Sequence, residues 1–308
     1  MAGGSDPSRR SGIVALAGRP NAGKSTLMNR LLAEKVAIVS DKPQTTRHVL
    51  IGILTEERGQ IVFHDTPGMH KPLHRLNRQM VRSAREALGG ADVACLVVDA
   101  STSFGAGERY MLDLFSGIDR PKVLVLNKID RMDKRRLLPI IERYSEAVAF
   151  DEIIPASALT GDGTERVVES LFRLLPEGEP LYDPELLTLH PERFLAAERI
   201  REKVLEHTED ELPFTTAVII DRWEEDDDSD LVRIFATILV ERVGQKKIVI
   251  GRGGSNVKAI GTAARLDLEE FLGRRVYLEL WVRIEPEWRE QRRVLAELDK
   301  EHLGAPPA

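Results

Sequence analysis

The chain lacks the features that mark secreted, membrane-spanning or broadly nucleic-acid-binding proteins. Its single cysteine, Cys95, lies in an apolar run, so we expect a buried thiol and no internal disulfide. No apolar stretch approaches the length of about 18 residues that a membrane span needs, and residues 1–12 have no signal-peptide core. Aromatic residues make up only 5% and the formal net charge is −6, so any nucleic-acid contact must come from a local basic patch. These absences favour a reduced, cytoplasmic location.

The most specific motif present is a glycine-rich octet at residues 18–25, Gly-Arg-Pro-Asn-Ala-Gly-Lys-Ser, directly after an apolar run. It is a complete G-x-x-x-x-G-K-[ST] phosphate-binding loop. In this pattern Gly18 and Gly23 let backbone N–H groups surround phosphate oxygens. Lys24 brings a positive charge to the β- and γ-phosphates, and Ser25 offers a hydroxyl to Mg²⁺. The helix predicted to begin at Lys24 points its positive end at the anion.

A second motif indicates which base is bound. Residues 127–130, Asn-Lys-Ile-Asp, follow a buried-strand pattern, so they lie at the edge where open α/β sheets bind ligands. A carboxylate at Asp130 can accept both N–H groups on one edge of guanine, which adenine lacks. Residues 157–159, Ser-Ala-Leu, fit the loop whose backbone contacts the guanine oxygen. A P-loop ATPase or small-molecule kinase is the alternative, but it would not explain Asn127 and Asp130 together.

A third motif, Asp65-Thr66-Pro67-Gly68, ends the apolar run 60–64. Its aspartate would hold Mg²⁺ through water, and the Gly68 amide would meet the γ-phosphate. A switch threonine should complete the metal site, and both Thr45 and Thr46 are candidates. The sequence pattern alone leaves that choice open.

The order of strand and helix patterns predicts two folded parts. From Gly12 to about Leu175 β-branched runs alternate with helical patterns, which favours a doubly wound, mostly parallel sheet. The expected strands are 13–17, 49–55, 60–64, 93–98, 122–126 and 152–155, and the expected helices are 24–33, 75–88, 107–116, 134–146 and 164–174. Prolines at 176, 180 and 184 then break the pattern. The second part has a helix at 192–207, strands at 215–223, 231–241 and 275–284, a helix to 272 and a last helix at 286–302.

A basic glycine turn distinguishes the second part. Gly251 and Gly254 form the only G-x-x-G of the chain, and residues 244–258 contain no acidic side chain. The basic residues there are Lys246, Lys247, Arg252 and Lys258. Such a loop lets a nucleic-acid backbone approach closely while the cations neutralise phosphates. The alternative is an ordinary helix-connecting turn.

With both parts considered, the chain resembles the Era family of bacterial GTPases, a Ras-like P-loop domain followed by a smaller α+β type II KH domain. The resemblance covers Gly12 to about Leu303. It is carried by GRPNAGKS at 18–25, QTTRH at 44–48, DTPGM at 65–69, NKID at 127–130, SAL at 157–159 and GQKKIVIGRGG at 244–254. It implies a disordered tail at 1–11, a G domain at 12–178, a linker at 179–191, a KH domain at 192–285, and a C-terminal helix and tail at 286–308. Residues 248–250 look strand-like, but the resemblance implies a short helix.

The resemblance also implies a function and a set of site residues. It implies a GTPase that binds Mg²⁺, GTP and GDP, binds the 3′ end of 16S rRNA, and acts in maturation of the 30S subunit. A monomer and peripheral association with the inner membrane are further expectations from the family. The nucleotide site should comprise Gly18, Arg19, Pro20, Asn21, Ala22, Gly23, Lys24, Ser25, Thr26, Asp65, Thr66, Pro67, Gly68, Met69, Asn127, Lys128, Asp130, Ser157, Ala158 and Leu159. The RNA site should comprise Lys246, Lys247, Gly251, Arg252, Gly253, Gly254 and Lys258.

Two positions predict how hydrolysis departs from the Ras pattern. The expected catalytic groups are Lys24, Thr46, which the resemblance favours on Mg²⁺, and the Gly68 amide. Met69 stands where a Ras-type enzyme has the glutamine that orients water, so intrinsic hydrolysis should be slow. Asn21 is similar to the asparagine of potassium-dependent GTPases, so its side chain is a candidate K⁺ ligand. A non-enzymatic RNA assembly factor with incidental turnover is the competing hypothesis.

Overall fold

The structure is a computed structural model that describes residues 9–42, 44–69, 74–209, 212–225 and 230–303. Its contacts divide the chain into two compact units, the first ending at Leu189 and the second beginning at His190. Two short segments, Ile38–Thr45 and His74–Leu76, group with the second unit. Residues 1–8 of the predicted tail and residues 304–308 lie outside the described part.

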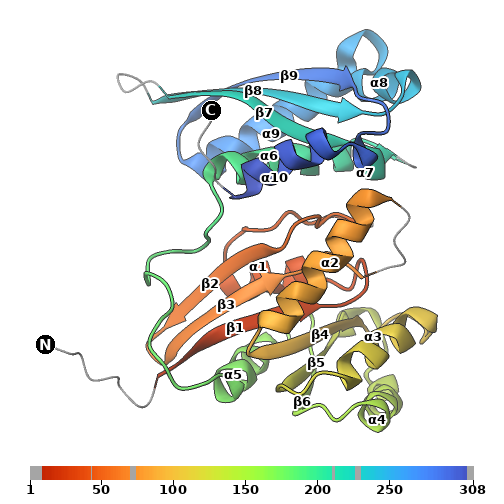
Figure 1. Cartoon of the computed structure of the whole chain (residues 1–308), viewed down its shortest axis with the longest axis vertical. Helices are drawn as coiled ribbons and strands as arrows, with labels where there is room; N and C mark the ends of the chain where they lie inside the picture. Colours follow the sequence, from red (N-terminus) through yellow and green to blue (C-terminus); the bar gives the residue numbers. More distant parts are fainter. Residues whose placement is uncertain (1–8, 43, 70–73, 210–211, 226–229, 304–308) are drawn as a thin grey trace, which may run out of the picture. The chain divides into compact units, whose positions relative to one another are not determined.

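The first unit contains a six-stranded sheet in the order β2-β3-β1-β4-β5-β6 (Figure 1). The strands are β1 (Arg10–Ala17), β2 (Leu50–Glu56), β3 (Gly59–Asp65), β4 (Val93–Asp99), β5 (Lys122–Asn127) and β6 (Glu152–Pro155). All neighbouring pairs are parallel except β2–β3. This confirms the predicted P-loop architecture, in which β1, β3, β4, β5 and β6 present their carboxyl ends at one edge.

Helices cover both faces of this sheet because its central strands are apolar on both sides. The helices are α1 (Lys24–Leu32), α2 (Arg75–Gly90), α3 (Ala106–Ser116), α4 (Leu137–Ala147) and α5 (Thr164–Leu174). The contacts of α1 and α5 with each other and with β1 and β3 place them on one face. One buried cluster joins Leu88 of α2, Met111 of α3 and Tyr144 of α4 to alternate residues of β1, β4 and β5, so these three helices cover the other face.

The start of the first unit differs from the prediction, because β1 begins at Arg10 within the expected tail. Arg10 pairs with Gly59 of β3, and its backbone N–H donates to the carbonyl of Arg58 at 3.0 Å. Its guanidinium also donates to the Leu175 carbonyl at 2.7 Å. A residue tied by backbone and side chain in this way belongs to the folded unit.

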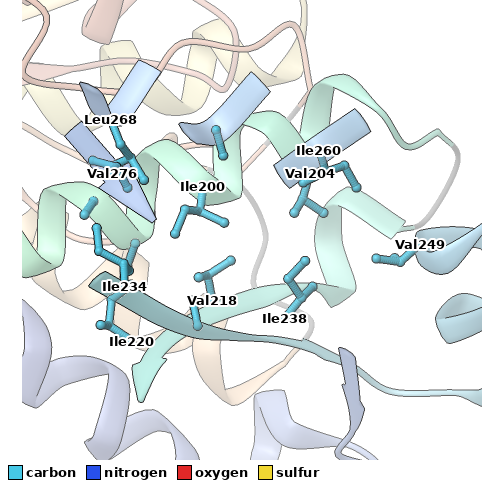
Figure 2. Packing of buried hydrophobic residues seen from close by; sticks show 14 of the residues in the cluster. Ile200, Val204, Val218, Ile220, Ile234, Ile238, Val249, Ile260, Leu268 and Val276 are labelled. Atoms are coloured by element: carbon cyan, nitrogen blue, oxygen red, sulfur yellow. The ribbon is translucent and has the colours of Figure 1, made fainter. Parts of the chain in front are cut away.

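The second unit packs helices on one face of a three-stranded sheet in the order β7-β8-β9. Its elements are α6 (Glu192–Glu206), α7 (Leu212–Thr215), β7 (Ala217–Glu225), β8 (Leu231–Val240), α8 (Val243–Ile250), η3 (Arg252–Gly254), α9 (Ser255–Leu272), β9 (Arg275–Ile284), η4 (Trp288–Glu290) and α10 (Arg292–Leu303). Alternate residues of the strands, including Val218, Ile234 and Ile238, point toward Ile200 of α6 and Ile260 of α9 (Figure 2). Without the short elements α7 and η3, the order from α6 to β9 is α-β-β-α-α-β, which agrees with the predicted KH domain.

Three elements of this unit correct or extend the residue-by-residue expectation. Residues 248–250 end helix α8, as the resemblance implied and against their strand-like composition. The last helix starts at Arg292 instead of 286, because Trp288 forms a separate turn and donates from Nε1 to the Thr215 carbonyl at 2.8 Å. Helix α7 was not predicted. Among the described residues, no helix is long and apolar enough to cross a membrane.

Candidate functional site

The phosphate-loop octet connects β1 to α1, and its glycines are required by close approaches. Gly23 is the N-cap of α1 with φ 90° and ψ 28°, a left-handed conformation that favours glycine. A Cβ atom there would lie 2.3 Å from Asn127 Nδ2, and one at Gly18 would lie 2.3 Å from the Val97 carbonyl oxygen. The loop therefore fits against β4 and β5 only with hydrogen atoms at these two positions.

Lys24 begins α1 and is only 5% exposed. Its Nζ donates to the Arg19 carbonyl at 3.2 Å, across the loop. Burial lowers the pKa of Lys24, and the nearby charge of Asp65 opposes that shift. The ammonium group thus lies within the loop whose backbone N–H groups are expected to hold phosphate.

Three oxygen-bearing side chains lie together beside Lys24. Ser25 Oγ donates to Asp65 Oδ2 at 2.5 Å and lies 2.9 Å from Thr46 Oγ1. Asp65 Oδ1 is buried without a hydrogen-bond partner in the described structure, and burial raises the pKa of Asp65 to about 6, against the lowering effect of Lys24. Hydroxyl and carboxylate oxygens with an unsatisfied acceptor fit a hard divalent cation such as Mg²⁺.

The two candidate switch threonines have different surroundings. Thr46 is 8% exposed and lies at the oxygen cluster, whereas Thr45 Oγ1 donates to the Lys42 carbonyl at 2.6 Å. Thr46 is thus the threonine that lies beside Ser25, and its role as a metal ligand stays a prediction from the resemblance.

The loop after β3 packs against the phosphate loop. Thr66 Oγ1 donates to the Leu16 carbonyl at 2.8 Å, and the Met69 N–H donates to the Gly18 carbonyl at 3.1 Å. The Met69 side chain is 2% exposed and belongs to the core under α2 and α3. Met69 therefore packs in the interior. The remaining predicted residues lie in three places. Pro20 and Asn21 are in the phosphate loop, Thr26 is in the first turn of α1, and Pro67 and Gly68 follow β3.

The base-recognition motifs after β5 and β6 are joined by side-chain hydrogen bonds. Asn127 donates from Nδ2 to the Ala22 carbonyl and accepts at Oδ1 from the Ala158 N–H, both at 2.9 Å. Ser157 Oγ donates to Asp130 Oδ1 at 2.6 Å, which holds the carboxylate in place. Residues more than a hundred positions apart are thereby brought to one edge of the sheet. The Leu159 carbonyl accepts from Arg30 at 2.5 Å.

Two charged contacts of the phosphate loop were not predicted. Lys128 Nζ donates to the Asn21 carbonyl at 2.6 Å and to Asp99 Oδ2 at 2.7 Å. Arg19 forms an ion pair with Glu108 of α3, whose side chain is 6% exposed. Asp99 could have been predicted near the loop, because it ends β4 at the edge of the sheet where ligands bind. No local sequence pattern marks Glu108.

The basic glycine turn lies between α8 and α9. Gly251 has φ 75°, and a Cβ there would lie 2.7 Å from Asn256 Cβ. Its N–H donates to the Lys247 carbonyl at 2.9 Å and ends α8. Arg252 and Gly253 are exposed at the tip, and Lys247 and Lys258 are exposed beside it. Lys246 is half-buried. The predicted RNA-binding residues therefore lie in the turn, in α8 before it and in the first turn of α9 after it.

Comparison with known proteins identifies both units. A family model described as "50S ribosome-binding GTPase" matches residues 13–128, and a KH domain model matches residues 211–289. GTPase Era of Geobacter metallireducens is 47% identical over 294 residues, covering 96% of this chain and 99% of that protein. GTPase Era of Heliobacterium modesticaldum is 46% identical and covers 93% of this chain and 95% of its own length.

Two solved structures are similar over both units. One is Era in complex with MgGDPNP and nucleotides 1506–1542 of 16S ribosomal RNA, with a TM-score of 0.91, 38% identity, and coverage of 94% of this chain and 98% of that one. The other is a single-residue variant of Aquifex aeolicus Era bound to GDP·AlF4⁻, with a TM-score of 0.90, 38% identity and the same coverage. With identity of this extent over nearly the whole length, this chain belongs to the GTPase Era family.

Proposed function

We propose that this protein is a GTP-hydrolysing switch that binds the 3′ end of 16S rRNA through its KH unit and acts in 16S rRNA processing and assembly of the 30S subunit. The observation that carries the proposal is that one chain contains both features: a guanine-nucleotide site whose motifs are joined by hydrogen bonds, and an exposed basic glycine turn. The similarity to an Era structure that holds both MgGDPNP and this RNA supports it. Association with the membrane surface and a monomeric state stay predictions taken from the resemblance alone.

Recognition of the nucleotide depends on groups that are already positioned. Asp130, held by Ser157, accepts the two N–H groups of guanine, and an adenine would leave this carboxylate unpaired. Lys24 and the loop N–H groups bind the phosphates. Ser25, Thr46 and, through water, Asp65 would hold Mg²⁺, which supplies charge neutralisation at the β- and γ-phosphates.

The protein's own contribution to hydrolysis is mainly electrostatic. Lys24 would neutralise the negative charge that develops on the bridging oxygen, and the Gly68 N–H would meet the γ-phosphate. Met69 is buried and has no group that could orient the attacking water. We therefore expect slow intrinsic hydrolysis, and faster hydrolysis when a bound ion or a binding partner stabilises the transition state.

Potassium is our candidate for an ion that stabilises the transition state. Asn21 lies in the phosphate loop in the left-handed region at φ 62°, and Lys128 donates to its backbone carbonyl, so the backbone that carries the Asn21 side chain is held in place. A K⁺ ion held there would place a positive charge beside the phosphates. Single-turnover hydrolysis in potassium and sodium buffers of equal ionic strength tests this idea, and equal rates for the wild type would contradict it.

RNA crosslinking and sequencing with Gly251→Asp tests the RNA-binding half. The Cβ clash with Asn256 and the added charge should remove the 16S rRNA signal while leaving guanine-nucleotide affinity intact. An unchanged crosslinking profile would refute the assignment of the turn. The competing hypothesis is an assembly factor in which turnover is incidental, and it is favoured if the RNA 3′ end leaves single-turnover hydrolysis unchanged.

A further inference from the structure

The sheet of the second unit has a face that its helices do not cover. Strand residues alternate, so Val232, Ile234 and the other core residues point to α6 and α9, and the residues between them point outward. On this outward face, Trp281 and Tyr277 of β9 are 62% and 47% exposed. These are large amphipathic rings, and exposed rings of this kind are enriched at surfaces that bind a ligand or a partner.

The exposed rings belong to a group of aromatic and arginine side chains. Phe235 of β8 lies with its ring centroid 6.0 Å from that of Tyr277, and the Arg222 guanidinium lies 4.0 Å from the Phe235 centroid. Three further exposed arginines point outward from β8 and β9, namely Arg233, Arg275 and Arg283. We call this set of seven residues the aromatic face.

Carboxylates on or beside the aromatic face form hydrogen bonds or ion pairs with their neighbours. Glu279 accepts from Tyr277 Oη at 3.1 Å, Glu224 pairs with Arg222 at 3.2 Å, and Asp221 accepts from Thr237 at 2.7 Å. The face therefore combines flat rings with guanidinium groups, of which Arg222 and Arg283 also pair with carboxylates, Arg283 with Glu285 at 4.0 Å. Sheet-borne aromatics with arginines are the usual platform for bases of single-stranded RNA.

The basic glycine turn lies near one end of β9, on the side of the sheet that the helices cover, and the aromatic face lies on the opposite side of the same strand. Helix α9 runs antiparallel to β9, because Glu269 accepts from the Val276 N–H at 3.2 Å while a Cβ at Gly261 would lie 3.5 Å from Leu280. The turn therefore lies toward the C-terminal end of β9, about 10 Å of helix beyond Gly261. Arg283 and then Trp281 are the first outward residues from that end.

We infer that the aromatic face is a second RNA surface, on which Trp281 and Tyr277 stack bases of the single strand that leaves the glycine turn. Arg283 and Arg275 neutralise its phosphates. The inference rests on the proposed binding of RNA at the turn. It adds that the RNA strand continues around the edge of β9, and that its bases are held there by stacking, which tolerates any sequence.

Single strands from the 3′ end of 16S rRNA, from about four to about twelve nucleotides long, test the inference. A glycine turn clamps about four nucleotides, so only the longer strands can reach the aromatic face. In the full-length protein, Trp281→Leu should weaken binding of the longest strand about 5- to 150-fold, the loss expected for one stacked base, and leave the shortest unchanged. Trp281→Phe should retain most of the affinity.

Fluorescence gives an independent measurement. Trp288 is buried and Trp223 is half-buried, so stacking on the exposed Trp281 should quench part of the emission when a long strand binds. This quenching should be absent in Trp281→Phe even though that variant still binds. Tyr110→Ala, which removes a 39% exposed aromatic ring from α3, is the matched control and should change nothing.

The outcomes separate the two proposals. If the wild type binds none of the strands, the proposed function fails. If it binds them but Trp281→Leu has unchanged affinity at every length, the aromatic face is not an RNA surface. The same conclusion holds if Trp281→Leu impairs only binding to 30S ribosomal proteins. A length-dependent loss together with quenching supports the inference.

Discussion

The phosphate loop and the basic glycine turn have the same local geometry in different surroundings. Each places a left-handed glycine with no side-chain cap at the start of a helix, Gly23 at φ 90° before α1 and Gly254 at φ 81° before α9. A Cβ at Gly23 would lie 2.3 Å from Asn127, whereas one at Gly254 meets nothing within 4 Å. Neighbouring atoms therefore enclose the first glycine, whereas the second faces open space.

The charges follow the same division. Lys24 is buried and has a lowered pKa, while Lys247, Arg252 and Lys258 are exposed. Electrostatic interactions are strong where water is excluded and weak where it screens them. We therefore expect large effects from single changes at the phosphate loop and small, salt-dependent ones at the turn.

The largest contrast should come from Lys24→Ala. Removing the buried charge beside the developing negative charge should slow single-turnover GTP hydrolysis about 100- to 1,000-fold at saturating nucleotide. Phosphate release is the measurement. Lys258→Ala is the matched control, since it removes an exposed lysine from the turn and should leave intrinsic hydrolysis unchanged. Hydrolysis by Lys24→Ala within about threefold of the wild type would mean that this lysine has no catalytic role.

A second contrast compares the two left-handed glycines. Gly23→Ala forces a methyl group against the Asn127 amide and should weaken binding of a fluorescent GDP analogue by at least about 100-fold. Gly254→Ala has open space and should cost only the left-handed conformation, about 1 kcal/mol of unfolding free energy. Equal nucleotide affinity in Gly23→Ala and wild type would show that the loop can shift away from Asn127.

A third prediction concerns the ion pair that ties the phosphate loop to α3. Glu108→Gln keeps the length of the side chain and removes its charge, so Arg19 should lose its anchor and nucleotide affinity should fall about 10-fold. Glu86→Gln breaks the exposed pair with Arg82 in α2 and should have no effect on affinity. If both variants bind alike in a nucleotide titration, the Arg19–Glu108 pair does not position the loop.

The order of motifs predicted which loops follow strand ends, and the strand ends of a parallel sheet meet at one edge. Asp130 and Ser157 were both expected at the guanine base, and they are hydrogen-bonded to each other. Glu108 was not predicted. It lies 89 residues from Arg19, in an amphipathic helix where a charged residue has no special pattern.

Helix α8 shows the opposite failure, in which a local pattern is misleading. Residues 248–250 are β-branched and favour a strand, yet Gln245 Oε1 accepts from the N–H groups of Glu241 and Arg242 at 2.9 and 3.0 Å, and Gly251 ends the helix. The buried residues of α8, Gln245 and Val249, are four positions apart, which is the spacing of one helix face. Tertiary packing and capping override propensity here, and only the family resemblance indicated it beforehand.

The smallest expected effect is that of removing one exposed charge from the turn, and it should be clearest in the salt dependence of RNA binding. Lys247→Ala removes one exposed charge near the tip, so RNA affinity should fall only a few-fold at moderate ionic strength. The slope of log affinity against log salt should fall by about 0.7, the value for one phosphate contact to a single strand. Lys134→Ala, an exposed lysine that pairs with Asp162 in the first unit, should leave the slope unchanged. An equal slope for wild type and Lys247→Ala would mean that this lysine contacts no phosphate.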